Sequence, residues 1–173
     1  MTDTSVSRLF LDFSRSTLAD QYWPRMRQCV ESLTAEQIWW RPNAESNSIG
    51  NLMLHLNGNV RQWLIDSFNG SRSARNRPAE FAAQDGPDAP ALIQTLGATV
   101  QEATDVLARL TEDELVRTFD VQGYSVTGLH AVYHVVEHFG MHYGQILYIT
   151  KQIRGEDLGF YRELNKTGSA SGQ

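Results

Sequence analysis

The chain has 173 residues, of which 41% are hydrophobic and 20% are charged, a composition typical of a folded globular protein rather than a disordered or fibrous one. A formal net charge of −5 gives no electrostatic attraction to nucleic acid or to an anionic membrane, and no apolar run approaches the roughly 20 residues that cross a bilayer. We therefore expect neither nucleic acid nor a membrane as a partner.

The single cysteine, Cys29, excludes an intrachain disulfide and a cysteine-rich zinc site, and its apolar helical surroundings favour a core position. The amino-terminal MTDTSVSRLF lacks the basic segment and long apolar run of an export signal, so we expect a cytoplasmic protein. Without an internal repeat, the sequence predicts one domain over residues 1–166 and a disordered tail at 167–173.

Apolar residues recur at helical spacing over four principal segments. The predicted helices span about residues 5–33, 48–68, 90–110 and 127–151.

The first helix changes phase partway along its length. One apolar face holds Val6, Phe10 and Phe13, and a nearly opposite face holds Leu18, Tyr22, Met26, Cys29 and Leu33. This helix therefore bends or serves two surfaces, and we expect a second copy of the chain, or alternatively residues 158–161, to cover the first face.

Turn and loop signals separate the helices. Capping boxes at Thr34 and Thr111 begin two short turns, and residues 118–126 are expected to be extended because their apolar residues break the helical period. Residues 71–89 combine Gly, Pro, Ser and charge, which predicts a long connection that can run the length of a bundle. The basic side chains of this connection, which we interpret as solvated rather than as a polyanion site, are Arg72, Arg75 and Arg77.

All five histidines fall on two predicted helices. His55 lies on the second helix, and the fourth helix carries His130, His134, His138 and His142 at steps of four residues. Because four residues advance a helix about 40° beyond a full turn, the last three form one shallow stripe. The stripe shares its face with Ala131, Val135, Met141, Gln145 and Ile149. It is therefore predicted to point into the bundle.

Buried imidazoles need hydrogen bonds or a metal ion, and divalent ions commonly bind neutral imidazole nitrogen. His138 and His142 supply two ligands from one helix, and His55, at the edge of the apolar arc of the second helix, can supply a third. Core or interface histidines satisfied by hydrogen bonds are the alternative. Two inward histidines, a third on another helix and no competing thiol favour the metal site.

The residues around these histidines resemble a known family. SIGNLMLHLNGNVRQW around His55, and HVVEHFGMHYGQI, which contains His138 and His142, are similar to the DinB-like, YfiT-like superfamily of metal-binding four-helix bundles, and the resemblance extends over nearly the full chain. It implies an all-α four-helix bundle with a long crossover connection, often a homodimer, that holds one divalent ion, zinc or nickel, through His55, His138 and His142. Some relatives transfer bacillithiol or other low-molecular-weight thiols, some isomerise maleylpyruvate with mycothiol, and many have no assigned reaction.

Several further side chains lie near the predicted ligands. His134, one turn before His138, could be a fourth ligand, but we favour a role in hydrogen bonding to a ligand or in packing. Gln145 is placed to hydrogen-bond a ligand imidazole or water, and His130 is not expected to be a ligand. Glu137, about 100° from His138 around the helix, is interpreted as solvated. The tryptophans, which we expect in the core or an interface rather than around a substrate, are Trp23, Trp39, Trp40 and Trp63.

A three-histidine ion with a free coordination position can make a nucleophile of a bound water or thiol. The sequence has no G-x-S-x-G elbow, P-loop or Rossmann fingerprint. We therefore expect a metal-dependent enzyme acting on a small molecule, of thiol S-transferase or hydrolase type, with a thiol as cosubstrate in the first case and no catalytic residue identified beyond the metal-bound nucleophile. The alternative is a non-catalytic metal-binding or stress-response protein. An open ion beside a cavity would favour the enzyme, and a sealed ion the alternative.

Overall fold

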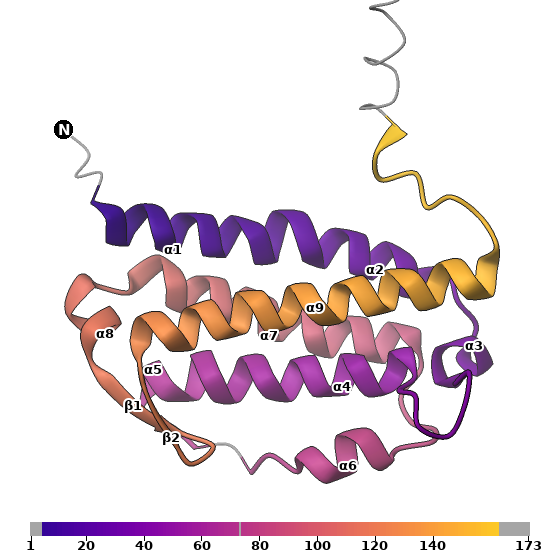
Figure 1. Cartoon of the computed structure of the whole chain (residues 1–173), viewed down its shortest axis with the longest axis horizontal. Coiled ribbons are helices and arrows are strands. Elements are labelled where there is room, and N and C mark those ends of the chain that lie inside the picture. The colour runs from indigo at the N-terminus through magenta and orange to yellow at the C-terminus, as the bar shows by residue number, and fades with distance from the viewer. Residues whose placement is uncertain (1–4, 73, 163–173) are drawn as a thin grey trace, which may run out of the picture.

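Four long helices run side by side in the computed structural model, which describes residues 5–72 and 74–162 (Figure 1). Together with the segments that continue them, the helices are α1, η1 and α2 (Val6–Ser16, Thr17–Tyr22 and Trp23–Glu31), α4, η2 and α5 (Ile49–Val60, Arg61–Asp66 and Ser67–Asn69), α7 (Ala89–Arg109) and α9 (Gly128–Arg154). The predicted tail at 167–173 lies outside the described residues. The predicted all-α bundle is confirmed, with one small hairpin added.

The shorter elements lie between the long helices. They are α3 (Ala35–Trp39), α6 (Arg77–Ala82), α8 (Glu112–Val116), β1 (Thr118–Val121) and β2 (Tyr124–Thr127). The capping boxes at Thr34 and Thr111 begin α3 and α8, as predicted. The extended segment is an antiparallel hairpin that pairs Phe119 with Val126 and turns at Gln122–Gly123, where both φ angles are positive (51° and 81°).

The long connection between α5 and α7 contains a helix that the sequence analysis did not predict. The Asn76 side chain accepts a hydrogen bond from the Ala79 N–H (3.2 Å), and Pro78 lies in the first turn, where a missing N–H costs nothing. The fully buried Asn51 of α4 then donates to the carbonyl oxygens of Glu80 and Ala83 (2.8 Å each). These bonds hold α6 against α4, where Figure 1 shows it at the outer edge of the bundle.

The phase change in the first helix coincides with the π-helical segment η1. Pro24, in the first turn of α2, has no N–H to donate to the carbonyl four residues back, and its ring would collide with that carbonyl in a regular α-helix. The wider π turn accommodates this conflict and rotates the apolar face that follows it. Leu18 and Met26 are consequently buried, whereas Val6 and Phe13 face outward.

The core fills the space between the four long helices. Its fully buried members include Met26, Ile38, Leu56, Leu64, Ala103, Phe139 and Ile146. Cys29 is 1% exposed, which confirms its predicted core position. Within the described residues, no helix is both long enough and apolar enough to span a membrane.

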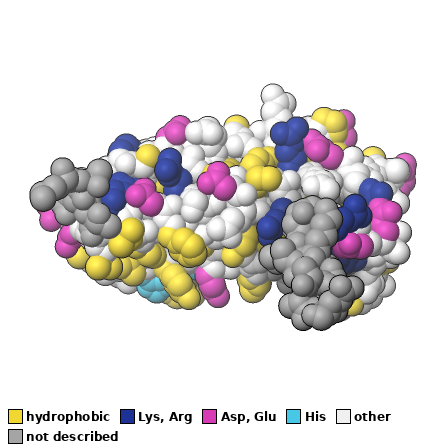
Figure 2. Space-filling view, turned by 90° about the horizontal axis from the view of Figure 1, so that it is seen from above, with side chains coloured by type: hydrophobic (Ala, Val, Ile, Leu, Met, Phe, Trp, Pro, Cys, Tyr) yellow, Lys and Arg dark blue, Asp and Glu magenta, His cyan; other side chains and the backbone are white. Residues whose placement is uncertain are grey.

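Exposed apolar side chains gather where α1, α8 and the start of α9 meet, at one end of the bundle (Figure 2). This apolar patch consists of Val6, Leu9, Phe13, Val116, Leu129 and Tyr133, each at least half exposed. Phe10, expected on the same face, is only partly exposed and packs against the core. Residues 158–161 do not cover the patch, because they turn back toward α2 at the other end, where Arg25 lies over the rings of Phe160 and Tyr161 (5.8 and 5.2 Å) (Figure 1).

We propose that a second copy of the chain covers the apolar patch, because apolar surface of this kind favours association. Light scattering over a dilution series should give about twice the chain mass of 19.5 kDa. Phe13→Asp, which places a charge in the patch, should shift the protein toward monomer. Tyr148→Asn removes an exposed aromatic ring far along α9 and should leave the mass unchanged. A wild-type protein that stays monomeric at high concentration would contradict the proposal.

Candidate metal centre

Three histidines from two helices meet inside the bundle. His55 comes from α4, and His138 and His142 lie one turn apart on α9. One ring nitrogen from each lies within 4.8 Å of those of the other two, and the Nε2 atoms of His55 and His138 are 2.8 Å apart. His55 and His142 are 2% and 7% exposed. The structure thus brings together the three histidines that the sequence predicts as ligands.

Packing between the two helices positions these rings. Leu52 and Leu56 of α4 are buried beside His55, and Val135, Phe139 and Ile146 of α9 are buried on the same helix as the other two histidines. Their burial fixes the rotation of each helix about its own axis. The four-residue step then places His138 and His142 one above the other, with their rings 4.4 Å apart between centroids.

His138 and His142 are held in the neutral form that binds metals. Burial, together with the neighbouring His142 and His55, lowers the pKa of His138 to about 3. Burial also lowers the pKa of His142, against the opposing effect of its hydrogen bond to Gln145. At neutral pH both rings therefore offer an unprotonated nitrogen.

Gln145 fixes which nitrogen of His142 is available. Its Oε1 lies 2.7 Å from His142 Nδ1, and because a carboxamide oxygen can only accept, Nδ1 carries the proton. Nε2 is then an acceptor, and it is buried without a hydrogen-bond partner among the residues that the structure describes. A buried acceptor without a partner is costly in a protein interior, and a metal ion at this position would satisfy it. The predicted contact between Gln145 and a ligand imidazole is present.

Glu80 plays the corresponding part for His55. Its Oε2 lies 2.9 Å from His55 Nδ1, and Arg75 holds both carboxylate oxygens, with Nε 2.7 Å from Oε1 and Nη2 2.8 Å from Oε2. Burial alone would raise the pKa of Glu80, but the hydrogen bonds from Arg75 and His55 lower it to about 2. The ionised carboxylate accepts from Nδ1–H, so Nε2 of His55, which faces His138 Nε2 at 2.8 Å, is the unprotonated nitrogen that could bind a metal. Arg75 Nη2 is also 3.1 Å from Nδ1, but a protonated Nδ1 cannot accept from it.

The interpretation of Arg75 as a solvated loop residue is wrong. Its side chain is 5% exposed, because the buried carboxylate of Glu80 attracts it into the bundle. Arg72 and Arg77 are exposed, as expected. Sequence analysis missed Glu80 because it gave residues 71–89 no helix. The available signal was the Asn76 cap followed by Arg77, Glu80 and Phe81 at spacings of three and four residues.

His134 lies beside the three-histidine group without belonging to it. Its Nε2 is 3.2 Å from Asn59 Nδ2, and its ring is tilted by 33° against that of Trp63, with 3.9 Å between the ring centroids. Burial lowers its pKa. These contacts match the favoured role in hydrogen bonding and packing, although the partner is Asn59 rather than a ligand.

Other predictions for α9 are only partly confirmed. His130 lies outside the group, and Glu137 is solvent-exposed, as expected. Met141 is 50% exposed and Gln145 is also exposed, so the prediction that both point into the bundle is wrong. The buried arc of α9 is centred on Val135, Phe139 and Ile146, and the predicted stripe lies at the edge of this arc rather than at its centre.

A cavity of about 390 Å³ opens beside the three-histidine group. Four of the five histidines line it, namely His55, His130, His134 and His138, together with Asn59 and Trp63. The hairpin closes another side with Gln122, Tyr124 and Val126. Trp63 is 5% exposed, which agrees with its predicted core position, yet its ring also forms part of the cavity wall. The cavity falls within the usual size range of small-molecule sites.

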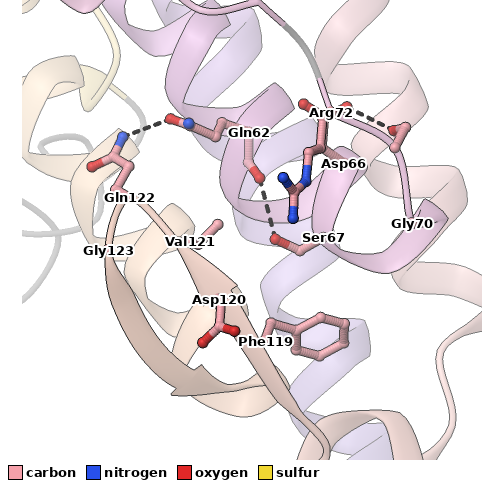
Figure 3. A pocket seen from close by; sticks show the side chains of 11 residues that line it. Gln62, Asp66, Ser67, Gly70, Arg72, Phe119, Asp120, Val121, Gln122 and Gly123 are labelled. Atoms are coloured by element: carbon pink, nitrogen blue, oxygen red, sulfur yellow. Dashed lines mark hydrogen bonds between the residues drawn. The ribbon is translucent and has the colours of Figure 1, made fainter.

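The hairpin is held in place by contacts between amide side chains. Gln122 at its turn and Gln62 of η2 are 2.7 Å apart, and Gln62 Oε1 also accepts from Arg75 Nη1 (3.1 Å). Figure 3 shows the contact between Gln122 and Gln62 at a second cavity of about 490 Å³, whose lining also includes Ser67 and Phe119. Gln122 therefore separates the two cavities.

Comparison with known proteins identifies the family and the fold. Residues 5–162 match the family described as "Protein of unknown function (DUF1572)", and the chain belongs to it. A conserved protein from Enterococcus faecalis has a similar structure (TM-score 0.71, 20% identity, 84% of this chain and 97% of that one). The DinB-like protein YjoA from Bacillus subtilis also has a similar structure (TM-score 0.65, 20% identity, 87% of this chain and 96% of that one).

A third similar structure is a DinB-like protein from Bacillus cereus (TM-score 0.60, 14% identity, 76% of this chain and 85% of that one). The fold is therefore DinB-like, as the sequence resemblance implied. The search of curated proteins gave no match.

Glu80→Ala should weaken zinc binding roughly 10- to 100-fold, because His55 loses the partner that fixes its Nδ1 proton and ring orientation. Competition against a chromophoric chelator would measure the loss. Glu80→Gln, whose amide oxygen can still accept from Nδ1, should fall between the wild type and the alanine variant. Glu137→Ala removes an exposed carboxylate next to His138 in the sequence and serves as the control. Equal losses for Glu80→Ala and Glu137→Ala would contradict the assigned contact.

Proposed function

We propose that the protein binds one divalent metal ion, zinc or nickel, through His55, His138 and His142, and is a metal-dependent enzyme acting on a small molecule. The carrying observation is that one ring nitrogen from each of His55, His138 and His142 lies within 4.8 Å of the other two, and that His55 and His138 also line a cavity. Imidazole nitrogens are ordinary ligands for both metals, and three of them leave a coordination position unused by protein.

The residues of the chain fit this role. Glu80 and Gln145 hold the Nδ1 protons of His55 and His142, so their Nε2 atoms can donate to an ion. Burial keeps His138 neutral. A divalent ion held there would supply the positive charge that makes a nucleophile of water or a thiol at neutral pH. Because the bundle core surrounds the histidines elsewhere, water would reach them only through the cavity.

A non-catalytic protein with a structural or regulatory ion is the alternative. The cavity favours an enzyme, because a purely structural site is closed and fully liganded by protein. Between the two reaction types, thiol transfer is preferred on the family resemblance, and hydrolysis uses the same site with water in place of the thiol.

Zinc or nickel should bind at one ion per chain. His138→Ala and His142→Ala should each weaken binding by more than about 100-fold, since each loses a ligand rather than a supporting contact. His134→Ala should retain most of the affinity, because the His134 side chain contacts Asn59 and Trp63 instead. Elemental analysis and chelator competition would measure both quantities. Comparable losses at positions 134, 138 and 142 would refute this division of roles.

Turnover by the metal-loaded protein should require a low-molecular-weight thiol. Mass spectrometry of mixtures with bacillithiol, cysteine or glutathione and a panel of electrophiles would detect the conjugate, and His142→Ala should abolish it. Product that forms with water alone would select hydrolysis. Stoichiometric metal binding without any turnover across the panel would favour the non-catalytic alternative.

A further inference from the structure

The charged side chains that line the cavity beside the three histidines are all positive. Its lining includes the guanidinium groups of Arg75 and Arg77 and, within the described part of the chain, no carboxylate. Glu80 lies behind Arg75 and is neutralised by it. A divalent ion at the histidines would add to the positive potential. Such a cavity attracts anions, and its apolar walls strengthen the interaction by excluding water.

The two arginines differ in what they can offer a ligand. Arg75 is committed to the protein, because Glu80 takes Nε and Nη2 and Gln62 takes Nη1. Arg77 forms no ion pair with any residue that the structure describes. Its guanidinium lies 4.9 Å over the ring of Phe81, an arrangement that leaves its in-plane N–H donors available.

Arg77 is also placed relative to the metal site by the helix that supplies Glu80. Arg77, Glu80 and Phe81 share one face of α6, so the contact of Glu80 with His55 fixes the position of the other two. The Phe81 ring packs against the His55 ring at 4.5 Å between centroids. A single aromatic ring therefore separates the ligand histidine from the guanidinium.

The remaining walls suit an organic body. Trp63, Tyr124 and Val126 present apolar surface, with the rings of Trp63 and Tyr124 6.5 Å apart. Asn59, 3% exposed, has an Oδ1 atom without a partner among the described residues, so it can accept one hydrogen bond from a ligand.

We propose that this cavity binds a small organic anion, with its carboxylate or phosphate at Arg77, its apolar body against Trp63 and Tyr124, and its reacting end toward the three histidines. The orientation of the reacting end toward the histidines rests on the proposed function, whereas the contact of the anion with Arg77 does not. The second cavity, across Gln122, lacks this selectivity because Asp66 and Asp120 line it together with Arg72 (Figure 3).

Matched pairs of thiols that differ only in charge test the proposal. Mercaptoacetate, mercaptopropionate and mercaptobenzoate, each against its carboxamide, would be titrated calorimetrically into zinc-loaded and metal-free protein. The spacers differ in length because the span from the histidines to Arg77 sets the best fit. A mercaptoethylphosphonate arm distinguishes phosphate from carboxylate recognition. At least one acid should bind about 5- to 10-fold more tightly than its amide, as for an ion pair with partial solvent access.

Arg77→Gln should remove this preference, while Arg72→Gln, an exposed arginine of the same connection, should preserve it. Equal affinities for acid and amide at every spacer, binding of neither at millimolar concentration, or equal losses in the two arginine variants would each overturn the proposal. Failure of the proposed function has a different signature. Zinc would then not bind, and the acid preference would persist in the metal-free protein.

Discussion

The packing of three imidazoles between two helices is the constraint on which the rest of the site depends. Each ring brings two nitrogens into a region without bulk water, and each nitrogen needs a partner. Glu80 and Gln145 satisfy one nitrogen on His55 and one on His142 and thereby direct the others inward. The Nε2 atoms of His55 and His138 are within hydrogen-bond distance of each other, but Nε2 of His142 has no partner among the described residues, and an ion would satisfy it.

The crossover connection serves the site as well as the topology. It spans the bundle between α5 and α7, and its short helix α6 places a carboxylate, an arginine and an aromatic ring against His55. Asn51 anchors this helix through two carbonyl oxygens, so the support for the ligand is built on hydrogen bonds to a buried side chain. A loop held only at its ends could not orient a histidine ring in the same way.

The hairpin completes the cavity from the opposite side. Its turn residue Gln122 bridges to Gln62, and the two strands bring Tyr124 and Val126 over the space beside Trp63. The resulting cavity is lined by histidines, by apolar side chains and by two arginines. The proposed reactivity at the histidines and the proposed recognition at Arg77 would thus come from different parts of the chain.

The sequence by itself determined the four long helices, their caps and the pairing of His138 with His142, because helical periodicity and a four-residue step are local properties of the chain. His55 was predicted to join this pair from its place beside the apolar arc of the second helix and from the family resemblance. It also indicated the break in the first helix through the change of apolar phase. Only the tertiary structure decided the roles of Arg75, Glu80 and Arg77. In the sequence these residues lie in a polar connection and look like solvated side chains. Their burial or exposure depends on where α6 packs against α4, and the contact between Glu80 and His55 joins residues 25 positions apart in the sequence. The same holds for Met141 and Gln145, whose exposure is set by how much of α9 its neighbours cover.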